Sequence, residues 1–549
     1  MKLLTSLQMR EVDNLTTSRF NISQMQLMET AGVAAAEFIE SMVRPTVERR
    51  IVVLCGKGNN GGDGFVVARH LAQHGGRPTV ILCADPTEVR GESENNLKRF
   101  LEGGNKIEAV RSVDQWRQVV HHLAAADVVV DALVGTGLRG AVSDPVATVV
   151  RDVNEHHKRH RFLVFSIDIP SGLSADTGDV PGDAIEADFT VTFTAPKVGM
   201  LLAPASEHVG RLKVVNIGSP RELVEECAEG HVRWLEPGEF SGISFYRPAD
   251  SNKGQYGHAL LVAGSLGKTG AAVMAGTAAL RAGAGLITAA VPEPCLPIVA
   301  AHTPEMMTEA LVATEAGSVS LRSLEYEHFN ELIRGKTVLA MGPGLGTHNA
   351  TQEFVRTVVQ KFDLPMILDA DALNAFAGNP RALRNHKSKH LVLTPHPGEM
   401  ARLIGSTAAE VQAHRIDVAR KAAADFQATV VLKGNQTVIA APDSKADGKV
   451  WINPTGNPGM AKGGTGDALT GMLTGILAEH GADNAFETGA ENWNRWICAA
   501  VYLHGLAGDI ASIDFGETSL MATDLINAIP KSLRQLKSQI DFLQFASRP

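Results

Sequence analysis

Short runs of β-branched and other apolar residues recur along this chain, and each is followed by glycine-rich or charged sequence and then by a helical stretch. The first run, Ile51–Cys55, precedes a glycine-rich turn and a predicted helix over Phe65–His74. Strands that alternate with helices form parallel sheets covered by helices on both faces. The sequence therefore predicts an α/β protein whose ligands bind beyond the carboxyl ends of the strands. Further predicted strands are Thr79–Cys83, Val128–Val130, Phe162–Ile167, Phe189–Phe193, Ala259–Ala263, Leu286–Val291, Thr337–Met341, Met366–Leu368, His390–Thr394 and Thr429–Leu432.

The alternating pattern occurs in two series, which predicts two domains. At roughly 100–200 residues per domain, a chain of 549 residues has room for two or more cores. The first series opens with an amphipathic helical region over Ser6–Met42, and the pattern dissolves into charged and proline-containing sequence between Gly218 and Ser251. We predict a first domain over residues 1–217, a linker over 218–240 and a second domain over 241–540.

Charge and cysteine content limit the class of protein. The chain carries 51 Lys and Arg against 60 Asp and Glu, a net charge of −9, and an acidic balance disfavours a general nucleic-acid or anionic-membrane binder. Its five cysteines are widely spaced and form no C-x-x-C pair, which is typical of reduced thiols rather than of a zinc site. No apolar run approaches the roughly 20 residues of a membrane span. We expect a cytoplasmic protein that binds neither nucleic acid nor membrane.

The segment Gly56–Gly64 joins the first strand to the next helix and contains the pattern G-x-G-x-x-G. With Asp85 as a ribose-binding acid it matches a dinucleotide-binding fingerprint, which is a weak signal on its own. Asn59, Asn60 and Asp63 stand where a pyrophosphate meets the helix, and a carboxylate there repels an anion. Their amide and carboxylate groups suit polar ligand groups or a hard cation. A plain glycine turn with Asp63 as the helix N-cap is the alternative interpretation.

Three more strand ends in the first series carry polar residues. Asp131 precedes the glycine-containing segment Gly135–Gly140. Asp168 follows a strand and precedes Pro170, which fixes the turn, and Lys197 follows the next strand. Each of these features alone is as a rule structural, whereas four polar strand ends around one sheet edge indicate a binding site.

Together these segments resemble the NAD(P)HX epimerase family, the YjeF N-terminal domain. The resemblance covers about residues 1–217 and rests on Leu27–Gly32, Gly58–Gly64, Asp131 with Gly135–Gly137, and Asp168–Gly172. It implies a Rossmann-like three-layer αβα domain that epimerises C6 of the hydrated nicotinamide ring of NADHX or NADPHX. It also implies that Asp168 contacts the substrate. We choose Asp168 as the acid/base group, because a bound cation can tune a carboxylate at the sheet edge, and Lys197 is a weaker candidate, for a phosphate contact. The implied substrate-binding residues are Asn59, Asn60, Gly61, Gly62, Asp63, Gly135, Thr136, Gly137, Leu138, Arg139, Gly140 and Ala141, and the implied potassium (K+) ligands are Asn60, Asp131 and Ser171.

The most informative stretch of the second series is Asn457–Gly471. Gly463–Gly466 can turn successive backbone N–H groups toward one point, which makes an anion-binding nest at a helix start, and Asp467 follows in the first turn. This arrangement suits phosphoryl transfer, in which donors hold the transferring group and a carboxylate takes the proton of the acceptor. A glycine turn whose aspartate is favoured by the helix dipole is the alternative interpretation. The stretch contains no P-loop pattern.

Other strand ends of the second series carry residues suited to a nucleotide site. Lys433–Thr437 follows a strand and can hold a nucleotide's phosphates or adenosine, and Met341–Gly346 ends another strand. Asp369–Asn374 supplies carboxylates suited to polar or magnesium-linked contacts. His396 lies between two prolines and is rigidly presented. For this histidine a structural role and a ligand contact both stay open.

The second half resembles the ribokinase-like α/β fold and, more closely, the ADP/ATP-dependent NAD(P)HX dehydratase family, the YjeF C-terminal domain. The resemblance covers about residues 240–530; Ser265–Lys268 departs from it, since an aromatic residue is expected close to Thr269. It implies binding of Mg2+ with ADP or ATP. As a hypothesis, Asp467 takes the proton of the C6 hydroxyl of the S hydrate, which attacks the terminal phosphate, and the phosphate ester then eliminates. The implied contacts to the hydrated nucleotide are Ala271, Gly344, His396 and Asp467, and those to the adenine nucleotide are Lys433, Gly434, Asn435, Gln436, Thr437 and Gly466.

One alternative function stays open at this point. A ribokinase-like kinase for a small alcohol or vitamin precursor, fused to a non-catalytic Rossmann-like ligand-binding domain, has the same Gly-Thr-Gly-Asp turn. The complete Asn-Asn-Gly-Gly-Asp segment together with Asp168 favours catalysis in the first domain. The resemblance further implies a homo-oligomer. The sequence does not determine the preference between ADP and ATP or between NADHX and NADPHX.

Overall fold

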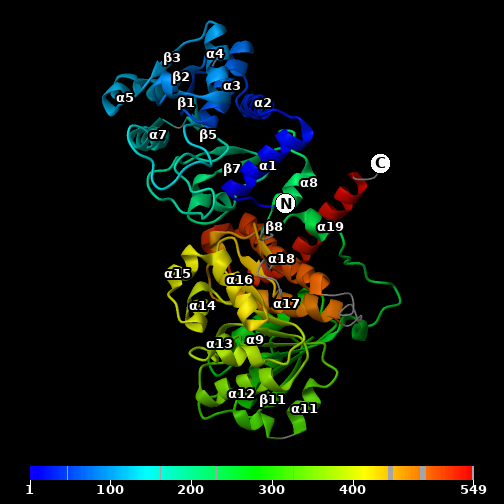
Figure 1. The fold of residues 1–549 in the computed structure, drawn as a ribbon. Helices are drawn as coiled ribbons and strands as arrows, with labels where there is room; N and C mark the ends of the chain where they lie inside the picture. The colour runs from blue at the N-terminus through cyan, green and yellow to red at the C-terminus, as the bar shows by residue number, and fades with distance from the viewer. Residues whose placement is uncertain are drawn as a thin grey trace. The chain divides into compact units, whose positions relative to one another are not determined.

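Two units make up the chain in the computed structural model, Lys2–Val232 and Arg233–Pro549 with Met1 (Figure 1). The structure describes all residues except 46, 48, 161, 229–231, 326, 443–448, 482–489 and 547–549. The boundary between the units lies within 218–240, the segment that we predict as a linker. That segment contains helix α8 (Arg221–Cys227) and strand β8 (Val232–Trp234), and its residues 229–231 lie outside the described residues.

The N-terminal unit opens with two helices, not with the single helical region predicted over Ser6–Met42. Helix α1 spans Ser6–Phe20 and helix α2 spans Gln24–Met42. The break is at Asn21, whose φ of 56° is left-handed, and asparagine tolerates this conformation better than most residues. Ser23 then caps α2 by accepting a hydrogen bond from the backbone N–H of Gln26, as N-cap serines do.

The sheet of the N-terminal unit has seven parallel strands in the order β3-β2-β1-β4-β5-β6-β7. The order reverses between β1 and β4, and ligands in such sheets bind at this switch point. β3 and β7 were not predicted because these edge strands are only partly buried and lack a continuous apolar run. The strands are β1 (Ile51–Cys55), β2 (Thr79–Leu82), β3 (Ile107–Ala109), β4 (Val128–Ala132), β5 (Leu163–Ile167), β6 (Phe189–Phe193) and β7 (Arg211–Val215).

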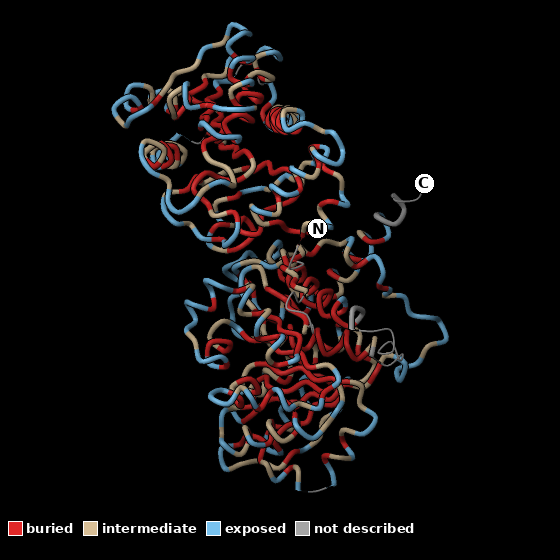
Figure 2. The backbone as a smooth tube through the Cα atoms, in the orientation of Figure 1, coloured by how far each residue is buried: buried red, intermediate tan, exposed pale blue. Residues whose placement is uncertain are grey.

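Helices cover both faces of this sheet, as predicted for a three-layer αβα domain. Successive residues of a strand point to opposite faces, so Val53 of β1 packs in one apolar core with α2, whereas Leu54 packs in the other with Trp116. The strands and the helix sides that face them are mostly buried (Figure 2). The remaining helices are α3 (Asn59–Gln73), α4 (Gly91–Glu102), α5 (Val113–Val119), α6 (His121–Ala125) and α7 (Val146–His160).

Helix α3 begins six residues before the predicted start at Phe65. Its N-cap is Gly58, so Asp63 lies inside the helix and the interpretation of Asp63 as an N-cap is wrong. The glycines in the first turns of α3 make the start of the helix hard to predict from the sequence, but packing in the folded unit requires them. A β-carbon at Gly61 would lie 1.8 Å from the carbonyl oxygen of Gly56, a clash with backbone.

The sheet of the C-terminal unit has ten strands in the order β11-β10-β9-β12-β13-β14-β15-β16-β17-β8. Strands β9 to β15 pair in parallel, while β16 and β17 add on as antiparallel strands. β8, β11, β16 and β17 were not predicted. The strands not yet given are β9 (His258–Val262), β10 (Leu286–Pro292), β11 (Met307–Leu311), β12 (Val338–Met341), β13 (Met366–Leu368), β14 (Leu391–Leu393), β15 (Thr429–Leu432), β16 (Val438–Ala440) and β17 (Val450–Ile452).

Helices α9 (Thr269–Arg281), α17 (Thr465–Gly481), α18 (Ala490–Ser519) and α19 (Ala522–Ala546) share one large apolar core with this sheet. A β-carbon at Gly471 would lie 2.1 Å from the carbonyl oxygen of Ala275, so glycine lets α17 approach α9 closely. Within α18, Trp493–Ser519 is long and apolar enough to cross a membrane, contrary to our reading of the sequence, but 72% of its most apolar stretch is buried. It is therefore a core helix, as in a soluble enzyme.

Candidate active sites in the two units

A cavity of about 690 Å³ lies at the carboxyl ends of the strands of the N-terminal unit. The segments that follow β1 and β4, the two strands at the switch point, both line it through Asn60 and Gly135. Asp168 after β5 and Lys197 after β6 line it as well. Helix α1 contributes Asp13, which the sequence analysis missed. The fold thus brings the polar strand ends of the first series into one cavity.

Asp168 is held in place by a buried lysine. Its φ of 66° is left-handed, an uncommon conformation for a residue with a side chain that is found often at functional sites. The Lys197 ammonium is 1% exposed and donates to the Asp168 carboxylate, to Thr192 Oγ1 at 2.9 Å and to the carbonyl oxygen of Phe193 at 3.2 Å. Since these charge-assisted hydrogen bonds fix the carboxylate, Lys197 positions Asp168 toward the cavity.

Two further carboxyl groups of this cavity have raised pKa values. Burial raises the pKa of Asp13 to about 6, with Lys197 opposing the shift and Asp168 adding to it. Burial also raises the pKa of Asp63 well above its ordinary value, and the charges of Asp168 and Asp13 act in the same direction. Asp13 can therefore exchange a proton near neutral pH. No motif surrounds Asp13 in the sequence, so only its burial in the folded unit identifies it.

Asp131 is the centre of a buried hydrogen-bond network beside the cavity. Its carboxylate is 0% exposed and accepts from Ser166 Oγ at 2.8 Å, from Ser171 Oγ at 2.5 Å and from the Ser171 backbone N–H at 2.8 Å. Burial raises its pKa, and these hydrogen bonds act against the rise. By contrast, both polar atoms of the Asn60 side chain are buried with no hydrogen-bond partner, which is rare in folded proteins.

The other predicted substrate residues of this unit divide into three groups. Asn59, Asn60, Asp63, Gly135, Thr136 and Gly137 line the cavity. Gly61 and Gly62 are buried against other parts of the unit, since a β-carbon at Gly62 would lie 2.6 Å from Met28 Sδ. Leu138, Arg139, Gly140 and Ala141 follow in a largely exposed segment that is not part of the cavity lining.

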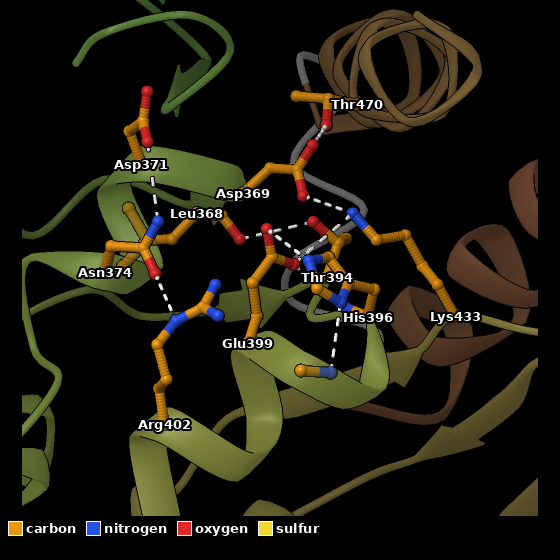
Figure 3. Close-up of polar contacts among 11 residues, drawn as sticks. Leu368, Asp369, Asp371, Asn374, Thr394, His396, Glu399, Arg402, Lys433 and Thr470 are labelled. Carbon is orange, nitrogen blue, oxygen red and sulfur yellow. Dashed lines mark hydrogen bonds and ion pairs between the residues drawn. The ribbon is translucent and has the colours of Figure 1, made fainter. Parts of the chain in front are cut away.

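A lysine–aspartate pair also lies at the strand ends of the C-terminal unit (Figure 3). Lys433 Nζ, at the end of β15, lies 2.7 Å from Asp369 Oδ1, at the end of β13. Thr470 Oγ1 of α17 donates to the other oxygen of Asp369 at 2.7 Å, and Glu399 Oε2 lies 3.8 Å from Lys433 Nζ. Burial disfavours the charge on Lys433, but the Asp369 and Glu399 carboxylates outweigh it and raise the pKa of the ammonium. Lys433 therefore keeps its charge in the site.

Asp467 lies in the first turn of α17, as predicted. Burial raises its pKa to about 6, the charges of Asp369 and Asp371 add to the rise, and Lys433 opposes it. A β-carbon at the neighbouring Gly466 would lie 3.5 Å from Lys433 Nζ, so the glycine segment comes close to the charged pair. Gly464 needs to be glycine because its φ is +97°. The geometry joins a backbone turn suited to anions with a carboxyl group that can take up a proton.

His396 stabilises the start of helix α14 (Pro397–Ile404). Its Nδ1 accepts from the backbone N–H of Gly398 at 3.0 Å, and Glu399 Oε2 accepts from the backbone N–H of His396 at 2.8 Å. Burial lowers the pKa of the imidazole. Its side chain remains 50% exposed although Nε2 lies 3.4 Å from Glu399 Oε1, so the capping role leaves part of the ring open to a ligand.

The other predicted contacts of the C-terminal unit lie in two turns. Gly344, with a φ of +64°, packs against Ala271 of α9, since a β-carbon at Gly344 would lie 3.0 Å from Ala271 Cβ. Lys433, Gly434, Asn435, Gln436 and Thr437 form the turn between β15 and β16. Arg415, missed in the sequence, donates to the carbonyl oxygens of Leu432 at 3.0 Å and Lys433 at 3.3 Å. Burial lowers the pKa of Arg415 to about 10, and its hydrogen bonds hold this turn.

Comparison with known proteins decides the family. The NAD(P)H-hydrate dehydratase family matches residues 259–531, and the family described as YjeF-related protein N-terminus matches residues 24–199. A bifunctional NAD(P)H-hydrate repair enzyme of Moorella thermoacetica is 42% identical over 546 residues, covering 98% of this chain and 98% of that one. The chain belongs to the bifunctional NAD(P)H-hydrate repair enzymes. A further member from Escherichia coli is 34% identical over 518 residues, covering 92% of this chain and 89% of that one.

Membership of the repair enzymes assigns two activities to this chain, NAD(P)HX epimerase and NAD(P)HX dehydratase. It decides against the alternative of a vitamin-precursor kinase fused to a non-catalytic domain. A similar solved structure is an ADP/ATP-dependent NAD(P)H-hydrate dehydratase from Bacillus subtilis co-crystallised with ATP/Mg2+. It is 34% identical and covers 56% of this chain and 99% of that chain, with a TM-score of 0.47.

Proposed function

We propose that the N-terminal unit epimerises the hydrate in its cavity with Asp168 as acid/base group, and that the C-terminal unit dehydrates the S hydrate with Asp467 as base. One observation carries this assignment. In each unit, a lysine-paired aspartate and a second aspartate with a pKa of about 6 meet at the carboxyl ends of the strands. Groups with pKa values near the working pH are efficient in proton transfer.

In the epimerase cavity, Asn59, Asn60, Asp63 and Gly135–Gly137 contact the substrate. Gly61 and Gly62 shape the segment that carries these residues, and the exposed segment Leu138–Ala141 extends the binding site beyond the cavity lining. Asp168, held by Lys197, exchanges a proton with the hydrated ring, and Asp13 is the neighbouring group that can store this proton. Asn60, Asp131 and Ser171 would hold a potassium ion. Their oxygen atoms suit a hard cation, and the partnerless side-chain amide of Asn60 supports the fit. A bound potassium ion supplies positive charge beside the reacting ring.

In the dehydratase site, Asp467 takes the proton of the C6 hydroxyl, and the hydroxyl oxygen attacks the terminal phosphorus of ADP or ATP, whose bond to the bridging oxygen breaks and releases AMP or ADP. Phosphate is a better leaving group than hydroxide, so loss of the C6 phosphate and of a proton from C5 then restores the dihydropyridine. Gly463–Gly466 donates backbone N–H groups to the transferring phosphate. Ala271, Gly344 and His396 contact the hydrated nucleotide, and Lys433–Thr437 with Gly466 contact the adenine nucleotide.

A magnesium ion would enter the dehydratase site mainly with the nucleotide. Both oxygens of Asp369 already accept hydrogen bonds, from Lys433 and Thr470, and Asp371 Oδ2 accepts the Gly346 backbone N–H at 2.8 Å. Mg2+ keeps several waters and is commonly held through one or two carboxylates plus substrate phosphates, which fits this occupied carboxylate set. Bound Mg2+ supplies positive charge to the phosphates.

The test starts from the pure R hydrate and the full chain. We expect the absorbance of the dihydronicotinamide ring to return only when Mg2+ with ADP or ATP is present, and more slowly when potassium is replaced by lithium. Starting from the pure S hydrate, the potassium effect should disappear because epimerisation is bypassed. A potassium effect of equal size on both hydrates would contradict the placement of the ion in the epimerase unit.

We also infer a cytoplasmic homo-oligomer. All five cysteines are free thiols, which suits a reducing compartment. On α18 and α19, large apolar side chains are exposed at Ile513 (82%), Phe515 (50%) and Phe542 (69%), and exposed apolar groups of this size suit a contact between copies. Sedimentation of the purified chain measures its oligomeric state.

A further inference from the structure

A cluster of two histidines and one glutamate lies in the N-terminal unit outside its cavity. His70 and His74 stand one helical turn apart on α3 and its C-cap, and Glu40 comes from α2. One ligand atom from each of the three side chains lies within 4.8 Å of the other two. We propose that Glu40, His70 and His74 form a binding site for a divalent transition-metal ion of the zinc class.

The distances suit a shared ion better than hydrogen bonds alone. His74 Nδ1 lies 2.9 Å from Glu40 Oε1, whereas His70 Nε2 lies 4.0 Å from Glu40 Oε2. The second distance is too long for a hydrogen bond, and His70 Nε2 is buried with no hydrogen-bond partner. Zinc binds imidazole nitrogen and carboxylate oxygen at about 2.0–2.2 Å and near-tetrahedral angles, which brings two of its ligand atoms to about 3.4 Å from each other. A small closing of the 4.0 Å gap therefore lets one ion bind both atoms and gives His70 its missing partner.

The surrounding backbone favours a cation. Helices α2 and α3 run in the same direction, because Met28 lies beside Gly62 near their starts and Glu40 lies beside His74 at their ends. Two helix C-termini therefore meet at the cluster, and each carries a partial negative charge. At a rise of 1.5 Å per residue, the seven residues from Asp63, the last residue of α3 that lines the cavity, to His70 place the cluster about 10 Å farther along the helix. The site is thus separate from the catalytic groups.

The donor set identifies the class of ion. Two imidazole nitrogens and one carboxylate oxygen suit Zn2+, Ni2+ or Co2+ rather than Mg2+ or Ca2+, which prefer oxygen ligands only. The His74 side chain is 50% exposed, so water can complete the coordination. An ion here would tie α2 to α3, and both helices contribute residues to the cavity. The expected consequence is a metal-dependent stability of the N-terminal unit.

The test is a calorimetric titration of the full chain with Zn2+ after chelator treatment. We expect one site whose affinity falls about tenfold or more in His70→Gln, and also in His74→Gln, which changes a half-exposed residue and spares the core. His156 and His160 provide the matched control, because they are also four residues apart on a helix and no described carboxylate completes that pair as Glu40 does here. His156→Gln should leave the affinity unchanged.

A second readout separates a specific site from scattered binding to surface histidines. Zn2+ should raise the thermal midpoint of the wild type and of His156→Gln but not that of Glu40→Gln. The proposal is overturned if His74→Gln and Glu40→Gln bind Zn2+ with wild-type affinity, or if His156→Gln weakens binding as much as they do.

Discussion

Each unit contains a lysine-paired aspartate and a second aspartate with a raised pKa, but the aspartate predicted to be catalytic is the lysine-paired one in the N-terminal unit and the other one in the C-terminal unit. In both, a lysine that follows one strand pairs with an aspartate at the end of another, the buried Lys197 with Asp168 and the partly buried Lys433 with Asp369. In both, burial brings the pKa of a second aspartate to about 6. In the C-terminal unit this second group is Asp467, the base that the sequence predicts. In the N-terminal unit it is Asp13, while the predicted group, Asp168, is the lysine-paired one.

The difference shows that a motif identifies a position but not the charge state of its carboxyl group. Recognisable signals mark both positions, since Asp168 lies between a strand and Pro170 and Asp467 follows the glycines of Gly463–Gly466. Whether such a carboxylate pairs with a lysine, as Asp168 does, or has its pKa raised by burial, as Asp467 does, depends on residues far away in the sequence. The comparison predicts that Asp467 works alone as a base, whereas Asp168 works together with Asp13.

The largest effect is expected for Asp467→Asn. Since the amide cannot accept the proton, dehydratase turnover should fall about 10³-fold, within the usual range for loss of a general base, while epimerisation is unchanged. Turnover of the S hydrate with ADP, measured by the returning absorbance, gives the first value, and interconversion of the two hydrates gives the second. The exposed Asp514→Asn serves as control. Normal dehydratase turnover in Asp467→Asn would remove Asp467 from the mechanism.

An intermediate effect is expected for Asp168→Asn. It should lower epimerase turnover about 10²-fold and also destabilise the N-terminal unit by about 3–5 kcal/mol, because Lys197 stays buried without its counter-ion. The double variant Asp168→Asn/Lys197→Met separates the two consequences. Chemical denaturation should show its stability largely restored, whereas its epimerase activity stays low. Restored activity would mean that Asp168 has only a structural role.

The smallest effect is expected for Asp13→Asn, and it depends on pH. The pKa of Asp13 rises from 3.8 to about 6 on folding, so between these values the folded state holds a proton that the unfolded state has released. Wild-type stability therefore falls as pH rises through this window, by about 3 kcal/mol in all. Asp13→Asn lacks this loss and should be more stable than the wild type by up to that amount at pH 8.

The advantage of Asp13→Asn should be small at pH 4 and should vanish only below about pH 3, where Asp13 is protonated in both states. Denaturant titrations at pH 4, 6 and 8 measure it. The epimerase activity of Asp13→Asn, measured as a function of pH, should lack a titration near pH 6 that the wild type shows. An unchanged profile would separate Asp13 from catalysis and leave the two units less alike than their geometry indicates.

Much of the fold could be predicted because its signals are local. Central strands such as β1 and β13 are continuous apolar runs, and the glycine segments after them mark the turns. The edge strands β3 and β7 escaped prediction since they are only partly buried. The start of α3 escaped because Gly61 and Gly62 disfavour a helix locally, while tight packing against Gly56 and Met28 requires them there.

The sequence alone determined the two α/β modules, their order, and the strand-end segments that carry Asp168 and Asp467, because apolar periodicity and turn residues act over a few neighbours. Only the tertiary structure decided that Lys197 binds Asp168, that Lys433 binds Asp369 and that Asp13 enters the cavity from α1. It also decided that Glu40 meets His70 and His74. These outcomes depend on desolvation and on contacts between residues far apart in the sequence, 29 positions for Lys197 with Asp168 and 64 positions for Lys433 with Asp369. No local sequence pattern records such contacts.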